Sequence, residues 1–174
     1  MKLMDAMHTY FQGEKIEALV FILPLGLLSI VFGAWLLSDN PGSFTRGVAI
    51  PCVVMGLVMT VVGAVVGYRT PAQVERLEAA IEAAPASALA EERARMDKVN
   101  QGWPIYLAVW AAFGVVGLGL RFGTRGDFTQ GLGISLVLFC GVCLVVDGFA
   151  ERRTHPWTAA LDTALAETVP PAAP

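Results

Sequence analysis

The sequence predicts an all-α membrane protein, a four-helix transmembrane bundle built from two parallel two-span repeats, with amphipathic helices on the cytoplasmic side. The first observation is composition: the 174 residues are 55% hydrophobic and 16% charged, whereas soluble domains are about 25% charged. The second is that the apolar residues form four long blocks, and the third is a short motif that occurs twice. A net charge of −3 gives no basic surface for nucleic acid, so no nucleic-acid partner is expected.

The four apolar blocks predict membrane-spanning helices over 18–37, 48–67, 104–120 and 131–150. A hydrocarbon core about 30 Å thick requires roughly 20 apolar residues in a helix, and a single segment satisfies its backbone in lipid only as a helix. We therefore expect one integral membrane domain over residues 1–174.

The distribution of Lys and Arg predicts the orientation of these spans. Four spans place the N-terminus, the central segment and the C-terminal segment on one side, which carries nine of the 12 basic residues. The other side carries Arg46, Arg121 and Arg125. Because basic residues favour the cytoplasmic side, both termini are expected in the cytoplasm, with the chain in a bacterial inner membrane.

An internal repeat is indicated by the pattern G-x-F-T-x-G, which occupies 42–47 and again 126–131, an offset of 84 residues. The same offset aligns Arg69-Thr70 with Arg153-Thr154. We expect repeats over about 18–84 and 102–168, related by a two-fold pseudo-axis along the membrane normal because each unit has two spans. The first glycine of each motif is expected to adopt a positive φ, and the threonine to cap the following span.

Amphipathic helices are predicted outside the spans. Thr70 and Pro71 have the pattern of an N-cap and first helical residue, Pro85 is expected to end that helix, and a second helix is expected over about 87–99. The C-terminal segment repeats the start at 154–157. We expect these helices to shield the cytoplasmic face or lie along the headgroups; a docking surface for a partner is the alternative.

Asp147 is the ionisable residue placed inside a predicted span, and such residues are functional candidates by default. Several other charged side chains are expected at the same depth, and together they form a candidate polar cluster: Glu14, Lys15, Glu17, Arg69, Asp147, Glu151 and Arg152. We expect a structural anchor in which Asp147 contacts Lys15, Arg69 or Arg152. A proton, ion or partner site is the alternative.

No catalytic or cofactor pattern is found. Cys140 and Cys143 form a C-x-x-C deep in the fourth span, where they are expected to be buried thiols that behave as small hydrophobes. His8 and His155 both lie outside the spans, which excludes a bis-histidine haem inside the bundle. We therefore expect no cofactor, no metal and no enzymatic activity. Small residues at helix-packing spacing are expected to join the spans to one another, with a dimer or partner seam as the alternative.

The segment 8–19, together with 68–70 and 151–153, resembles a group of small uncharacterised bacterial inner-membrane proteins. That resemblance implies no activity and no site. The expected function is non-enzymatic: the chain lies in membrane lipid and binds a protein partner or a second copy, as an accessory subunit or as an immunity protein against a membrane-acting toxin. The alternative is a small transporter or channel subunit that uses Asp147.

Overall fold

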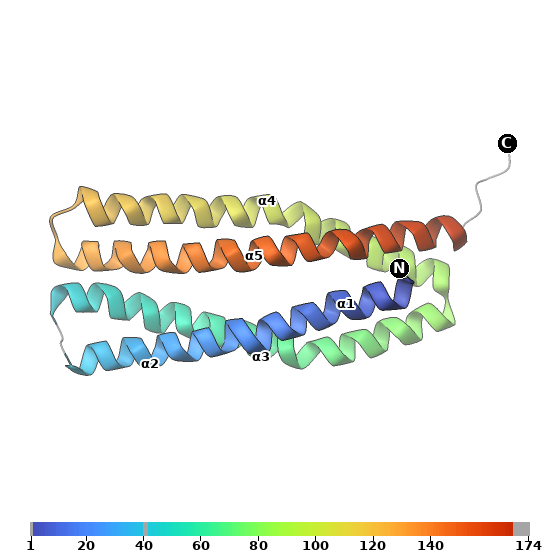
Figure 1. Ribbon diagram of the computed structural model, residues 1–174, viewed down its shortest axis with the longest axis horizontal. Coiled ribbons are helices and arrows are strands. Elements are labelled where there is room, and N and C mark those ends of the chain that lie inside the picture. Colours follow the sequence, from blue (N-terminus) through green and yellow to red (C-terminus); the bar gives the residue numbers. More distant parts are fainter. Residues whose placement is uncertain (1, 40–41, 169–174) are drawn as a thin grey trace.

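The computed structural model describes residues 2–39 and 42–168, nearly all of them helical. The helices are α1 (Leu3–Ile16), α2 (Leu23–Asp39), α3 (Ser43–Ala83), α4 (Pro85–Gly123) and α5 (Asp127–Thr168), and a π-helix, η1 (Glu17–Ile22), joins α1 to α2. Figure 1 shows α1, η1 and α2 as one continuous rod beside the three longer helices. The prediction of an all-α fold is confirmed.

The molecule thus has four rods: the first is α1, η1 and α2 together, and the others are α3, α4 and α5. Each rod contains a segment long and apolar enough to cross a membrane. The end of α2, the start of α3 and the α4–α5 connection lie at one end of the molecule, and the start of α1, the α3–α4 connection and the end of α5 lie at the other (Figure 1). We call residues 17–69 and 103–150 the apolar half, and residues 2–16, 70–102 and 151–168 the polar half.

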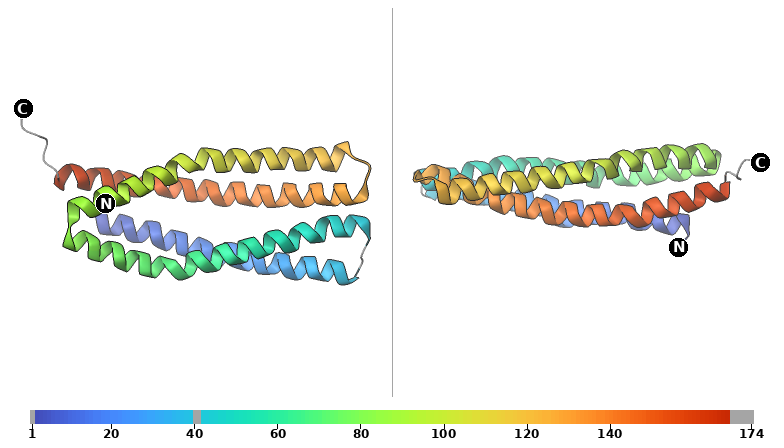
Figure 2. Two further views of the ribbon diagram at one scale, coloured as in Figure 1. Left: turned by 180° about the vertical axis from the view of Figure 1, so that it is seen from behind. Right: turned by 90° about the horizontal axis from the view of Figure 1, so that it is seen from above.

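In the apolar half the helices are arranged as a zigzag row. The main contacts join α2 to α3, α3 to α5, and α5 to α4, and the two views in Figure 2 agree with this order. Helices α3 and α5 are therefore central, and α2 and α4 form the edges. Many large apolar side chains on these helices are exposed, as lipid-facing surfaces would be.

The polar half encloses a hydrophobic core of its own, to which α1 contributes by packing against α3 and α5. Side chains from α1, α4 and α5 are fully buried there, and α3 packs against them: Met7, Phe11, Leu89, Met96, Trp157 and Leu161. The expectation that these helices lie along the headgroups is wrong. They continue the spans in the same direction, because their apolar stripes pack against one another.

The helices also continue through the threonines that were expected to start new ones. Thr70 Oγ1 donates to the carbonyl oxygen of Val66 at 2.6 Å, and Thr154 Oγ1 donates to that of Glu151 at 2.7 Å. Both threonines are buried, and Pro71 and Pro156 lie inside α3 and α5. A Thr-Pro pair is tolerated here because packing on both sides, rather than local preference, determines helix length.

The two G-x-F-T-x-G motifs do not form the expected turns. No described glycine has a positive φ, and Gly42 is extended, with φ −56° and ψ 160°. Helix α3 begins at Ser43, so Thr45 lies within its first turn and is not a cap. Thr129 likewise lies inside α5, where its hydroxyl donates to the carbonyl oxygen of Gly126 at 2.7 Å.

The last glycine of each motif is required by a close helix contact. A β-carbon on Gly47 would collide with the carbonyl oxygen of Phe128, and one on Gly131 would collide with that of Phe44. The starts of α3 and α5 therefore touch through their backbones, in two reciprocal contacts.

Within each hairpin, another glycine makes an equivalent contact. A β-carbon on Gly33 would lie 2.8 Å from the carbonyl oxygen of Ala49, and one on Gly117 would lie 2.9 Å from that of Gly133. Gly33 and Gly117 are 84 residues apart in the sequence, and so are their neighbours Ala49 and Gly133. The expectation that small residues pack the spans together is confirmed at these sites and at three further glycines of α3: Gly56, Gly63 and Gly67.

Candidate functional site

A cavity of about 300 Å³, here called the central cavity, lies where the polar half meets the apolar half. All four rods contribute to its wall. The lining residues are Tyr10, Glu14, Glu17, Ala18, Ile22, Val66, Arg69, Arg95, Val99, Trp103, Tyr106, Val146, Asp147, Ala150 and Arg153.

The π-helix forms one side of this cavity. Pro24 has no N–H, and its ring clashes with the carbonyl four residues earlier in a regular α-helix, so the chain widens into a π-turn just before it. Glu17, Ala18 and Ile22 of η1 line the cavity as a result. Such π-turns are frequent at functional sites.

Two ion pairs connect the N-terminal rod to the cavity wall. Arg69 Nη2 lies 3.4 Å from Glu14 Oε1, and Arg153 Nη2 pairs with Glu17 Oε2. The sequence expectation placed Arg152 in this cluster, and that assignment is wrong. Adjacent helix residues point about 100° apart, and Arg153 is the one that lines the cavity.

Asp147 is held by a neutral donor. The indole Nε1 of Trp110 on α4 donates to Asp147 Oδ2 at 2.7 Å, and no Lys or Arg nitrogen in the described part of the chain lies within 4 Å of this carboxylate. The expected contact with Lys15, Arg69 or Arg152 is therefore wrong. Trp110 gives the carboxylate one hydrogen bond without placing a second charge in the apolar half.

A buried carboxylate lies behind the cavity wall, in the core of the polar half. Glu92 accepts hydrogen bonds from Arg95 Nε at 2.8 Å and Arg95 Nη2 at 2.7 Å, and from Trp157 Nε1 at 3.1 Å. The two bonds from Arg95 raise its pKa above the usual value, because they favour the charged guanidinium.

Tyr10 connects this network to the cavity. Its ring stacks on Trp157 with the centroids 6.4 Å apart, and it also lines the cavity wall. Burial raises the pKa of Tyr10, and the negative charge of Glu14 raises it further.

The structure brings together only part of the predicted polar cluster. Glu14, Glu17, Arg69 and Asp147 line the central cavity, whereas Glu151 and Arg152 do not. Sequence reasoning missed five polar or aromatic members of the wall: Tyr10, Arg95, Trp103, Tyr106 and Arg153. The sequence did contain one indication of a buried charge near the cavity: Glu92 lies between Leu89 and Met96 on the apolar stripe of its helix.

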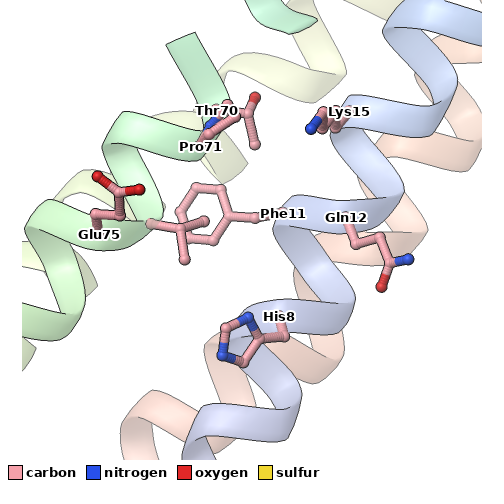
Figure 3. Close-up of a pocket in the computed structure, with 8 residues that line it drawn as sticks. His8, Phe11, Gln12, Lys15, Thr70, Pro71 and Glu75 are labelled. Atoms are coloured by element: carbon pink, nitrogen blue, oxygen red, sulfur yellow. The ribbon is translucent and has the colours of Figure 1, made fainter. Parts of the chain in front are cut away.

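Lys15 lines a different cavity, of about 410 Å³, between α1 and α3. Figure 3 shows Phe11 pointing from α1 towards Thr70 and Pro71, with His8 further along α1 and Glu75 on α3. His8 Nε2 lies 3.0 Å from Glu78 Oε1. This cavity lacks the convergence of all four rods that distinguishes the central one.

The cysteines form no disulfide in the part of the chain that the structure describes. All three thiols are free, with Cys52 and Cys140 buried and Cys143 half-buried. No group of three or more His, Cys, Asp or Glu side chains among these residues is arranged to hold a metal ion.

Fold and site together define an all-α protein with four helices long and apolar enough to cross a membrane, and a charged cavity where the rods meet. Comparison of the chain with protein-family models, curated proteins and solved structures gives no match.

Proposed function

We propose that this chain is a non-enzymatic protein of the bacterial inner membrane that acts by binding a partner in or at the membrane. The central cavity holds the polar part of that partner. The observation that carries this proposal is Asp147, a carboxylate without an ion-pair partner in a cavity walled by all four rods. Charges inside a membrane are costly, and those that persist commonly serve a site.

The orientation follows from the basic residues. Nine of the 12 lie at the end that carries the polar half, which favours a cytoplasmic location for that end. The central cavity then lies at the level of the inner-leaflet headgroups. Trp103 in its wall is consistent with this depth, because tryptophan is enriched at membrane–water interfaces.

The proposal includes two parallel repeats. Support comes from the offset of 84 residues, which relates Gly33 to Gly117 and Gly47 to Gly131, each with equivalent neighbours. It also relates the first residues of α3 and α5. The position equivalent to Asp147 is Gly63, so the first repeat has no equivalent carboxylate. The proposed binding site is therefore not duplicated with the repeat.

A protein partner would meet the edges of the row. Helices α2 and α4 expose large apolar side chains, among them Leu28 and Val115. An accessory-subunit role, an immunity role or self-association would use these edges.

Native mass spectrometry of protein extracted in mild detergent tests the binding role. Val146 lines the cavity, whereas the neighbouring Val145 is 59% exposed, so the pair provides a matched comparison. We expect a retained ligand mass in the wild type and in Val145→Trp, and its loss in Val146→Trp. The helical circular dichroism of both variants checks folding. No retained mass in any protein, or equal retention in all three, would contradict the proposal.

The second candidate is a small transporter or channel subunit, and the unpaired carboxylate of Asp147 favours it. Proteoliposomes with a pH-sensitive dye inside separate the two roles. Proton flux lost in Asp147→Asn, but kept in the exposed variant Asp127→Asn, would establish transport. Ligand binding without flux would establish the binding role alone.

A further inference from the structure

We propose that the central cavity binds a zwitterionic group with a primary ammonium and a phosphodiester, as in the headgroup of phosphatidylethanolamine. This inference rests on the proposed binding role of the same cavity and names the chemistry of its ligand.

The charges of the wall favour a ligand that carries both signs. Three carboxylates and three guanidinium groups line the cavity: Glu14, Glu17, Asp147, Arg69, Arg95 and Arg153. Each arginine has an acidic partner, since Arg95 is held by Glu92 behind the wall. A purely anionic or purely cationic ligand would meet as much repulsion as attraction in such a wall. A zwitterion can direct each end towards the opposite charge.

Two donors in the wall lack acceptors. The Nε1–H of Trp103 and the Nε–H of Arg153 are buried and make no hydrogen bond within the described residues, and both residues line the cavity. Buried N–H groups are normally satisfied. Phosphate oxygens accept strongly from guanidinium groups, so a phosphodiester suits this part of the wall.

The ammonium end is assigned to Asp147. This carboxylate accepts one hydrogen bond, from Trp110, and retains further lone pairs for a donor. The rings of Trp103 and Tyr106 in the same wall provide faces that attract a cation. A primary ammonium donates three hydrogen bonds, whereas a trimethylammonium donates none, so the site should prefer ethanolamine to choline.

The position of the cavity points to a lipid as the source of this group. Ile22, Val66 and Val146 line it from the apolar half, and Glu14 and Arg95 line it from the polar half. The cavity therefore straddles the boundary at which headgroups lie. Its volume of about 300 Å³ is at the lower end of the range for ligand sites, as expected for a headgroup whose acyl chains stay outside.

The test uses the full chain, delipidated in detergent and titrated by native mass spectrometry with three lipids of identical acyl chains. We expect phosphatidylethanolamine to bind about tenfold more tightly than phosphatidylcholine or phosphatidylglycerol. Asp147→Asn should abolish the preference for ethanolamine over choline, and Trp103→Phe should weaken binding of all phosphate-bearing lipids. The controls Asp127→Asn and Trp35→Phe, both at exposed positions, should bind as the wild type does.

Competition with soluble glycerophosphoethanolamine shows whether the bound group belongs to a membrane lipid or to a soluble molecule. Weak competition supports a membrane lipid, and competition as strong as that of the lipid supports a soluble molecule with the same group. Equal binding of the three lipids, or an unchanged preference in Asp147→Asn, would overturn the inference. If the lipid fails but a different mass is lost in Val146→Trp, only the headgroup assignment fails. If no mass is retained by any protein, the binding role fails as well.

Discussion

The indole N–H of Trp110 on α4 donates a 2.7 Å hydrogen bond to the carboxylate of Asp147 on α5. This bond joins an edge helix to a central helix within the apolar half. Because the donor is neutral, the negative charge of Asp147 is not compensated by an ion pair. The same contact therefore positions the carboxylate in the cavity wall and leaves it available to a ligand.

Substitution of Trp110 by phenylalanine should destabilise the protein, because it removes the donor and leaves a half-buried carboxylate without its hydrogen bond. The expected loss is about 1–3 kcal/mol, measured by unfolding in mixed detergent micelles. Trp35→Phe is the control, since Trp35 is 55% exposed and should give a change near zero. Equal losses in the two variants would show that the Trp110 bond contributes nothing specific.

Alkaline pH should weaken the fold through Tyr10. Its pKa is raised by burial and by Glu14, so the unfolded chain ionises first as the pH rises above about 10, and stability falls from there towards the higher pKa of the folded state. Tyr10→Phe should reduce the fall between pH 9 and pH 11.5, followed by thermal unfolding at each pH. Tyr68→Phe, at an 88% exposed position, should leave the profile unchanged; a profile identical in all three proteins contradicts this assignment.

Glu92→Gln should be among the most damaging changes in the polar half. It leaves the guanidinium of Arg95 without a counter-charge beside a buried core, a change that costs about 3–5 kcal/mol for fully buried pairs. Because the Arg95 side chain is 36% exposed, solvent screening reduces the expected loss to about 2 kcal/mol. Glu91→Gln, one residue away and exposed, should cost little in the same chemical unfolding series, and comparable losses would refute the buried role.

Gly47→Ala and Gly131→Ala should destabilise the protein to a similar extent, because each added methyl meets a carbonyl oxygen of the other hairpin. Overpacking of this kind costs about 1–3 kcal/mol. Gly119→Ala and Gly141→Ala are suitable controls, since nothing lies within 4 Å of a β-carbon built at either site. Strongly unequal effects of the first two changes would count against two equivalent repeats.

The orientation is accessible to cysteine labelling in a background without native thiols. Ser43→Cys and Asp127→Cys should react with an impermeant maleimide added outside intact cells, and Ser87→Cys should react only after lysis. All three positions are exposed, so a missing signal cannot be ascribed to burial. Labelling of Ser87→Cys from outside would show that the orientation is the opposite of the one proposed.

The sequence was sufficient to predict the helices, because long apolar blocks have one stable backbone form in lipid. It did not predict that the helices continue through Thr70-Pro71 and Thr154. A Thr-Pro pair is compatible with the start of a helix and with its middle, and only the packing of Leu77 and Leu161 in the polar half distinguishes the two. That packing depends on helices far apart in the chain.

The sequence predicted the level along the helices at which the candidate site lies, but not which face of each helix points into it. Residues rise about 1.5 Å each along a helix, so counting places Glu14, Glu17, Arg69 and Asp147 at one level, and all four line the central cavity. Which face each helix turns inward depends on its neighbours. For this reason Arg153, and not the expected Arg152, lines the cavity. Arg95 and Trp103 of α4 also line it, although no local sequence pattern shows which face of α4 points inward.

Ala84 alone separates α3 from α4, and this has a consequence for how the chain is divided. A cut there would leave two polypeptides of nearly equal length, each a hairpin whose two ends lie on one side. Neither fragment could complete the polar core alone, because Met7 and Phe11 belong to the first and Trp157 and Leu161 to the second. The intact molecule is in this sense a tethered heterodimer, whose two subunits are synthesised at a fixed one-to-one ratio and at high effective concentration.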